Sequence, residues 1–259
     1  MVDGYAVGRL LGAGGTATVW EAVGPDGQPR ALKVLDRLAG SPPAEAAGAA
    51  EEGPADDGAG ERSAALLREL ALLRRVRHPH VVAVRDISTT ATGEPVLVLD
   101  LAAGGSLAAL VRRRRRLAVG EVVSILTAVG SALEDLHAAG AVHADVSPGN
   151  VLLAADGTPL LADLGVARAL GDVGGWLHVT SGFSDPALED GGEVTAASDV
   201  YGLAAVAWFA LTGSPPPREG RLTRRRARQE LPEGMPPELA DLLRGAHVPA
   251  CWLVPLEWA

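Results

Sequence analysis

The sequence predicts an α+β protein in two lobes, a small strand-rich lobe over residues 1–101 and a larger helical lobe over residues 102–259. Short alternating apolar runs, separated by glycine and proline turns, dominate the first hundred residues. Apolar residues at helical spacing dominate the rest, and an Ala-Gly-Gly break at 103–105 separates the two patterns. With 259 residues, 47% of them hydrophobic, the chain is long enough to bury a sizeable core.

The first lobe is expected to contain five strands and one main helix. A glycine cluster and a Gly-Pro-Asp-Gly-Gln-Pro turn separate the first three strands, and a stripe of leucines marks the helix, which His78-Pro79 ends. The strands are predicted at residues 5–11, 18–23, 30–35, 81–86 and 95–101, and the helix at residues 63–76.

Residues 39–61 differ from the rest of this lobe. The segment consists mainly of Ala, Gly, Pro and acids, with six Asp or Glu residues and no Lys or Arg. Such a composition cannot bury a core, so we predict a disordered acidic insertion. It supplies six of the charges behind the formal net charge of −9.

The second lobe is expected to be mostly helical, with one small hairpin. The helices are predicted at residues 106–115, 121–139 and 199–212, and the hairpin strands at residues 151–153 and 160–162. The helix at 199–212 is apolar nearly all round, which predicts burial. After about residue 244 the pattern stops, and we interpret the apolar C-terminal tail as a candidate surface for a protein partner.

Composition excludes several classes of protein. A net charge of −9 is unlike that of a general nucleic-acid-binding domain, so no nucleic-acid partner is expected. Cys251 is the only cysteine, which rules out an intrachain disulfide and fits a reducing compartment. We find no signal-peptide pattern, and the longest apolar stretch, residues 203–211, is too short to span a membrane. We therefore expect a cytoplasmic protein.

Two residue types are almost absent, and the positions that keep them are informative. Lys33 is the only lysine beside 22 arginines, and Asn150 is the only asparagine. Asn150 stands five residues after Asp145 and thirteen before Asp163. An amide oxygen and a carboxylate can hold Mg²⁺ together with phosphate oxygens, while another carboxylate can accept a proton from a hydroxyl. A glycine-rich hairpin between the first two strands could place backbone N–H groups over phosphates.

Taken in their order along the chain, the motifs resemble those of the protein kinase superfamily, specifically bacterial serine/threonine kinases of the eukaryotic type. The resemblance covers about residues 4–213. Its parts are the glycine loop at 12–17, Ala-Leu-Lys at 31–33, a helix glutamate, His-x-Asp-x-x-x-x-Asn at 143–150 and Asp-x-Gly at 163–165. The runs at 99–107 and 198–203 are also similar to the family's pattern.

The resemblance implies a two-lobed protein kinase-like fold and transfer of the ATP γ-phosphate to Ser or Thr of a protein substrate. Asp145 would be the catalytic base, and Lys33, paired with Glu69, would hold the α- and β-phosphates. Asn150 and Asp163 would bind Mg²⁺, and Asp199 would anchor the catalytic loop. The remaining ATP-binding positions that the resemblance implies are Gly12, Gly14, Val19, Ala31, Leu99, Asp100, Ala102 and Leu152.

The sequence also departs from the family pattern. Ala17 replaces the third glycine, Ala187 replaces the glutamate of Ala-Pro-Glu, and Ser147 replaces a lysine that contacts the γ-phosphate. Ala144 replaces the arginine that meets an activation-loop phosphate, which argues against that kind of switch. Two alternatives therefore stay open: a pseudokinase that binds nucleotide or protein, and a small-molecule phosphotransferase of the aminoglycoside or choline kinase type.

Two further features have competing interpretations. His143 is better explained as a structural core histidine than as a base. The run Arg112–Arg116 is most simply a solvated helix end, with docking of a substrate as the alternative.

Overall fold

A computed structural model describes residues 2–14, 17–35, 77–163, 180, 182–189, 192–216, 231–232 and 235–245. These residues form two compact units, each considered by itself. The first contains the described residues up to 77 together with residues 82–101, and the second contains residues 78–81 and the described residues from 102 onward. Several predicted features lie outside the described residues: the acidic insertion at 39–61, the helix at 63–76 with Glu69, and the C-terminal tail.

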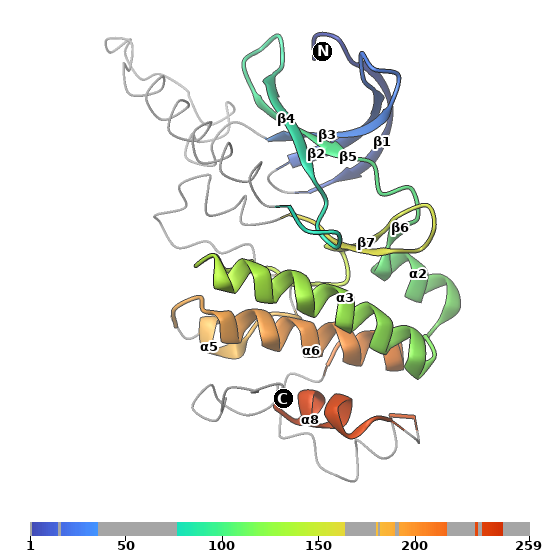
Figure 1. The fold of residues 1–259 in the computed structure, drawn as a ribbon, viewed down its shortest axis with the longest axis vertical. Helices are drawn as coiled ribbons and strands as arrows, with labels where there is room; N and C mark the ends of the chain where they lie inside the picture. Colours follow the sequence, from blue (N-terminus) through green and yellow to red (C-terminus); the bar gives the residue numbers. More distant parts are fainter. Residues whose placement is uncertain are drawn as a thin grey trace, which may run out of the picture. The chain divides into compact units, whose positions relative to one another are not determined.

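The first unit is built on one antiparallel sheet with the strand order β1-β2-β3-β5-β4 (Figure 1). Its strands are β1 (Ala6–Ala13), β2 (Ala17–Val23), β3 (Pro29–Leu35), β4 (Val84–Thr89) and β5 (Pro95–Asp100). The Asp26–Gly27 turn joins β2 to β3, and Gly27 takes a positive φ of 74° there, which favours glycine.

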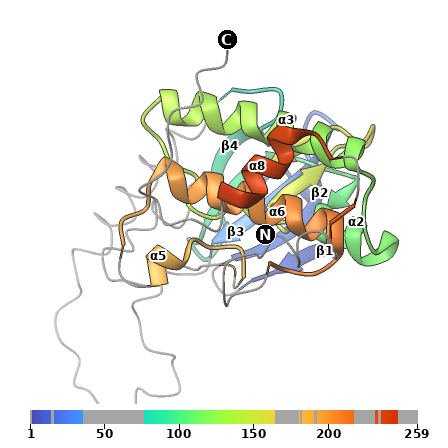
Figure 2. The same ribbon diagram turned by 90° about the horizontal axis from the view of Figure 1, so that it is seen from below.

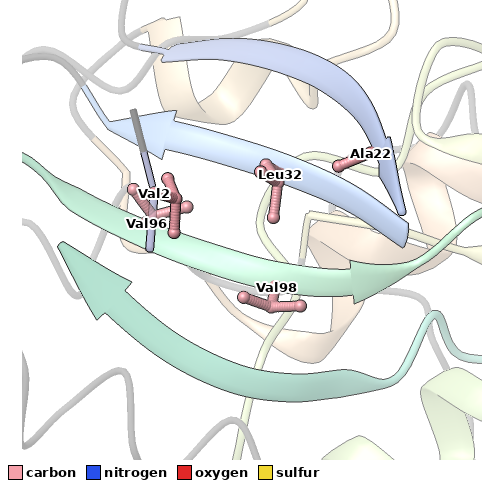
Figure 3. Close-up of a cluster of buried hydrophobic side chains, with 5 residues drawn as sticks. All are labelled: Val2, Ala22, Leu32, Val96 and Val98. Atoms are coloured by element: carbon pink, nitrogen blue, oxygen red, sulfur yellow. The ribbon is translucent and has the colours of Figure 1, made fainter. Parts of the chain in front are cut away.

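The strand β5 is buried because both of its faces carry apolar side chains. Val96 and Val98 face one way, and Leu97 faces the other. The first cluster comprises Val2, Ala22, Leu32, Val96 and Val98 (Figure 3). The second comprises Ala17, Leu35 and Leu97, with Val84, Ile87 and Leu99 packed against it. Two clusters on opposite faces hold β2, β3 and β5 in one register.

The predicted strand at 81–86 is wrong at its start, because β4 begins at Val84. The N–H of Val81 donates to the carbonyl of His78 and closes a turn after the His-Pro pair. Val81 then forms a parallel bridge with Leu161 in the second unit, while His80 O accepts from Leu161 N–H. Residues 78–81 therefore belong to the second unit, and β4 begins three residues after Val81.

The second unit combines helices with a small three-stranded sheet of order β6-β7-β8. Its strands are β6 (Gly105–Ser106), β7 (Val151–Leu153) and β8 (Pro159–Leu161). Its helices are α2 (Leu107–Arg114), α3 (Val119–Ala138), α5 (Pro186–Glu189), α6 (Ala196–Thr212) and α8 (Pro237–Gly245). The two-residue strand β6 was not predicted. Gly104 allows it to pair with β7, since a Cβ there would lie 2.6 Å from the carbonyl oxygen of Ala154.

The helix α6 is the buried centre of this unit, as its all-round apolar sequence predicts. It contacts both α3 and α8. Figure 1 shows α3 and α8 on opposite sides of α6, and Figure 2 shows α8 lying over it from below. Trp208 fills this centre and is only 1% exposed. A strand-rich unit followed by a helical unit confirms the predicted α+β class. Among the described residues, no helix is long and apolar enough to span a membrane.

Candidate active site

The loop 143–150, between α3 and β7, holds Asp145 by hydrogen bonds to both of its carboxylate oxygens. Asn150 Nδ2 donates to Asp145 Oδ2 over 2.7 Å and to the Asp145 carbonyl over 2.8 Å. Thr180 Oγ1 donates to Asp145 Oδ1 over 2.8 Å. The carboxylate is thus fixed on one side by an amide and on the other side already accepts a hydrogen bond from an aliphatic hydroxyl.

Asp199, near the start of α6, anchors this loop through hydrogen bonds to its backbone. Its Oδ2 accepts from the N–H of His143 and its Oδ1 from the N–H of Ala144, each over 2.8 Å. His137 Nε2 contacts Oδ2 over 2.8 Å. Asp199 is 1% exposed, so these charge-assisted bonds replace the water that the carboxylate loses. The expected anchoring role of Asp199 is confirmed.

His143 connects the segments that carry Asp145 and Asp163. Its Nδ1 accepts from the N–H of Asp145 over 3.2 Å, so the ring proton resides on Nε2. Nε2 then donates to the carbonyl of Ala162 over 2.9 Å. Both ring nitrogens are occupied and the side chain is 2% exposed, which supports the structural interpretation of His143. A neutral imidazole thereby fixes the spacing between the Asp145 segment and the residue before Asp163.

Asn150 and Asp163 are brought together by the pairing of their neighbours. The N–H of Ala162 donates to the carbonyl of Asn150 over 2.8 Å, which places Asp163 one residue beyond the bonded pair. Asn150 Nδ2 donates to Asp145, and Asn150 Oδ1 makes no hydrogen bond with any described residue. An amide oxygen and a carboxylate are hard donors of the kind Mg²⁺ takes, so this pair fits the predicted metal.

Backbone strain is concentrated in the same loops. Ala144 has φ 72° and Asp163 has φ 65°, in the left-handed region that residues other than glycine rarely occupy. Arg115 is the only further described residue other than glycine with positive φ. Such conformations persist only where surrounding contacts hold them, and here the Asp199 and His143 bonds do so.

In the first unit, the strand register collects four predicted ATP-binding residues on one face of the sheet. Val19 pairs with Lys33 across β2 and β3, and Ala31 pairs with Leu99 across β3 and β5. Directly paired residues share a face, and Ala31 and Lys33 share one because they are two apart on β3. Ala31 is 7% and Lys33 8% exposed. The unit thus presents one buried cation beside small and apolar side chains.

Gly12 and Gly14 leave open space at the end of β1. A Cβ on Gly12 would meet no atom within 4 Å, and one on Gly14 would meet only the carbonyl oxygen of Ala17, at 3.7 Å. Neither glycine has a positive φ. Packing against the described residues therefore does not require glycine at these positions, whereas close approach of a phosphate to the backbone would.

Of the positions expected to contact adenine, Asp100 lies at the end of β5, Ala102 is two residues further on, and Leu152 lies in the middle of β7. The N–H of Asp100 donates to the carbonyl of Ala83 over 3.1 Å, so only its carbonyl remains for an adenine edge. Its carboxylate forms a two-point ion pair with Arg85, at 2.7 and 2.5 Å. This pair raises the pKa of Arg85 from its ordinary value.

Sequence reasoning missed two residues of the site. Thr180 stands in a loop without a distinctive pattern, and its bond to Asp145 depends on tertiary structure that no local pattern encodes. His137 gave a detectable signal, because it is four residues after Leu133 and so lies near the inward stripe of α3. A polar residue beside a buried stripe indicates a buried partner, which is Asp199.

The chain belongs to the protein kinase family: residues 5–238 match the protein kinase domain. It is 34% identical over 262 residues to the serine/threonine-protein kinase PkaB of Streptomyces coelicolor, an alignment that covers 92% of this chain. It is 40% identical over 151 residues, 57% of this chain, to the serine/threonine-protein kinase PknK of Mycobacterium tuberculosis. The predicted resemblance to bacterial kinases of this type is confirmed.

The chain accounts for only part of these relatives. The alignments span 57% of PkaB and 14% of PknK. A third relative, the serine/threonine-protein kinase PknE of Mycobacterium bovis, is 33% identical over 221 residues, which cover 82% of this chain and 35% of PknE.

Proposed function

We propose that the protein transfers the γ-phosphate of ATP to serine or threonine hydroxyls of a protein substrate. The observation that supports this most directly is the hydrogen bond from Thr180 Oγ1 to Asp145 Oδ1, at 2.8 Å. A substrate hydroxyl that took the place of Thr180 would meet a carboxylate already oriented to accept its hydrogen. The names of the relatives described above favour a protein substrate over a small molecule.

Each residue has a proposed task in this reaction. Asp145 orients the acceptor hydroxyl and takes its proton, while the oxygen bonds to the γ-phosphorus and ADP leaves. Lys33 binds the α- and β-phosphates through its ammonium group, and Gly12 and Gly14 leave the backbone accessible to phosphate oxygens. Asn150 and Asp163 hold Mg²⁺, which neutralises phosphate charge when bound. Asp199 and His143 position these groups without contacting the substrate.

We expect the enzyme to be slow. The family resemblance places a γ-phosphate-binding lysine at 147, whereas Ser147 carries no charge and is 2% exposed. Loss of one preorganised charge stabiliser lowers a rate by about 10²–10³-fold in comparable cases. The remaining groups at Lys33, Asp145, Asn150 and Asp163 keep the reaction available.

Phosphate transfer from labelled ATP, with Mg²⁺ and a generic basic protein as acceptor, tests the proposal. We expect incorporation on serine or threonine that Asp145→Asn abolishes, while Asp156→Asn, in an exposed turn of the same unit, leaves it unchanged. Equal incorporation by the wild type and Asp145→Asn would overturn the proposed role of Asp145.

Thermal unfolding distinguishes a kinase from a module that binds only protein. ATP with Mg²⁺ at a hundred times its dissociation constant stabilises a folded protein by about 2.7 kcal/mol. We expect a shift of this size, reduced in a variant that carries both Asn150→Ala and Asp163→Ala. A stable protein that shows neither a shift nor transfer would be a pseudokinase.

A further inference from the structure

Four arginines in the last turn of α2 and directly after it form a group of exposed charges. Arg112, Arg113, Arg115 and Arg116, which we call the arginine turn, are all solvent-exposed. Arg114, in their midst, forms a two-point ion pair with Glu121, at 2.6 and 3.0 Å. The other four make no ion pair or side-chain hydrogen bond with any residue the structure describes. Four positive charges therefore face solvent within five residues, in a chain whose formal net charge is −9.

The arginine turn is held in place by the buried residues on either side. Val111 is 1% exposed and Leu117 is 4% exposed. The N–H of Arg115 donates to the carbonyl of Val111 over 2.7 Å, and the N–H of Leu117 donates to the carbonyl of Ala210 in α6 over 2.8 Å. The backbone that carries the charges is thus tied to the centre of its unit, and less ordering is needed when a ligand binds.

Stability of the helix does not account for so many cations. Positive charges near a helix C-terminus are favourable by about 0.3–1 kcal/mol each at an exposed site. Arg115 and Arg116 lie beyond the last helical residue, Arg114, and Arg115 also adopts a φ of 73°. Adjacent like charges repel one another, and the positive φ of Arg115 adds further strain. Glycine would fit this backbone, with φ 73° and ψ −43°, better than arginine does, so the sequence keeps a charge at a position that disfavours it.

The helix α2 connects the arginine turn to the catalytic loop. The N–H of Ala108, in the first turn of α2, donates to the carbonyl of Pro148, over 2.9 Å. The arginine turn is at the other end of this eight-residue helix, which is about 12 Å long (Figure 1). An extended peptide covers this distance with about four residues. The turn and Asp145 also belong to the same compact unit.

We propose that the arginine turn docks an acidic segment of the protein substrate, several residues from the phosphorylated hydroxyl. This rests on the proposed kinase function for its purpose, although the binding itself does not require catalysis. Guanidinium groups bind carboxylates through paired hydrogen bonds, and clustered charges accelerate association with an oppositely charged partner. The preferred substrate carries an acidic block about four to eight residues from its serine or threonine.

Direct binding tests the docking surface independently of phosphate transfer. The probe is a fluorescein-labelled peptide with a run of eight Asp and Glu residues, compared with the same peptide carrying Asn and Gln. We expect anisotropy to show at least fivefold tighter binding of the acidic peptide, which weakens as salt increases. Arg112→Gln with Arg113→Gln is expected to remove this preference. Arg9→Gln with Arg77→Gln removes two exposed arginines from the first unit, one of them paired with Glu21, and is the control for an equal change of charge.

A second variant, Arg115→Gly, separates loss of docking from loss of folding. Glycine adopts a positive φ without strain, so the change removes a charge while relieving strain. We expect this variant to be at least as stable as the wild type and to bind the acidic peptide less tightly. Preserved binding in both arginine-turn variants, or equal loss in the control, would overturn the proposal.

Steady-state kinetics then tests the link to catalysis. Peptides carry one serine, with the acidic block two, four, six or eight residues away on either side. We expect KM to be lower, with kcat unchanged, for peptides that carry the acidic block on one particular side of the serine and at the longer spacings. This difference should disappear in the arginine-turn variants. Binding of the acidic peptide without phosphate transfer would contradict the kinase function alone. Phosphate transfer without a preference for acidic peptides would contradict the docking site alone. Tighter binding of an oligonucleotide or of phosphatidylserine vesicles, lost in the same variants, would assign the surface to those ligands instead.

Discussion

Asp199 supports the site through a single buried carboxylate that three nitrogen groups contact. The N–H groups of His143 and Ala144 and the ring of His137 all lie 2.8 Å from its oxygens. Ala144 has a positive φ of 72°, and the bonds on either side of it, from its own N–H to Asp199 and from the Asp145 N–H to His143 Nδ1, hold this conformation. The strained Ala144 and its anchor Asp199 therefore act together to hold Asp145 in position.

We predict that Asp199→Asn destabilises the protein and lowers phosphate transfer. The Asn amide keeps one oxygen but directs its NH₂ group at a backbone N–H, which leaves a buried donor unsatisfied. Breaking a buried charged network in this way costs about 3 kcal/mol. Urea denaturation measures the change, and Asp156→Asn is the control, because Asp156 lies in an exposed turn where an amide oxygen still accepts the Thr158 N–H. A difference below about 0.5 kcal/mol, the usual range for surface changes, would contradict the anchoring role.

At the scale of elements, the sequence predicted strands and helices well where their hydrophobic period is strong. The alternating β2 and β3, the stripe of α3 and the apolar α6 all lie within a few residues of their expected ranges. Errors occurred where tertiary contacts decide the boundary. Val81 and Val82 are apolar and β-branched, yet β4 begins later because Val81 bridges to Leu161. The strand β6 exists only because Gly104 permits close approach to β7.

Two helical glycines give opposite predictions. A methyl on Gly202, in α6, would lie 2.7 Å from the Val146 carbonyl oxygen and 2.9 Å from its Cβ, so the catalytic loop must move. We expect Gly202→Ala to destabilise by about 1–3 kcal/mol and to reduce transfer, because Val146 follows Asp145. A methyl on Gly130, in α3, would meet only Leu203 Cδ2, at 3.8 Å. We expect Gly130→Ala to stabilise by about 0.5–1 kcal/mol through helix propensity. Denaturant midpoints measure both variants, and the same sign for both would refute this packing argument.

The connection between α2 and α3 gives a prediction about pH. The Arg114 guanidinium, and then the N–H of Ala118, lower the pKa of Glu121 from its ordinary value of 4.5. A lowered pKa in the folded state stabilises the protein above pH 4.5, and this contribution disappears as the pH falls through the folded-state pKa. Glu121 is 40% exposed at its side chain, so solvent screening limits the effect to less than about 1 kcal/mol.

We therefore expect Glu121→Gln to be less stable than the wild type at pH 7, and we expect this difference to shrink as the pH falls toward about 2–3. Urea denaturation at several pH values measures this difference. Glu134→Gln, on an exposed face of the same helix, makes no ion pair with any described residue and controls for the loss of charge. A stability difference that does not change with pH would show that the ion pair contributes nothing.

At the scale of the whole molecule, composition carries information that local patterns do not. The chain has 22 arginines beside one lysine, and one asparagine. Their rarity alone singles out Lys33 and Asn150 as candidates for chemistry. The fold buries Lys33 on β3 and bonds Asn150 to Asp145. Residues whose roles depend on distant partners, such as Thr180 and His137, could not be found in this way, because their own types are common in the chain.

The scarcity of lysine also makes nucleotide binding measurable on the intact chain. Lys33 carries the only side-chain amine, so an ATP analogue with an amine-reactive acyl phosphate can acylate one side chain. Lys33 is 8% exposed, which leaves little access for a reagent that does not bind first. We expect mass spectrometry to find the acyl group on Lys33, to find labelling suppressed by excess ATP, and to find none in Lys33→Arg. Asp145→Asn should label normally, since it removes the proposed base and keeps the proposed phosphate contact. Labelling that excess ATP does not suppress would show that Lys33 does not contact the bound nucleotide, and would contradict its proposed role in binding phosphate.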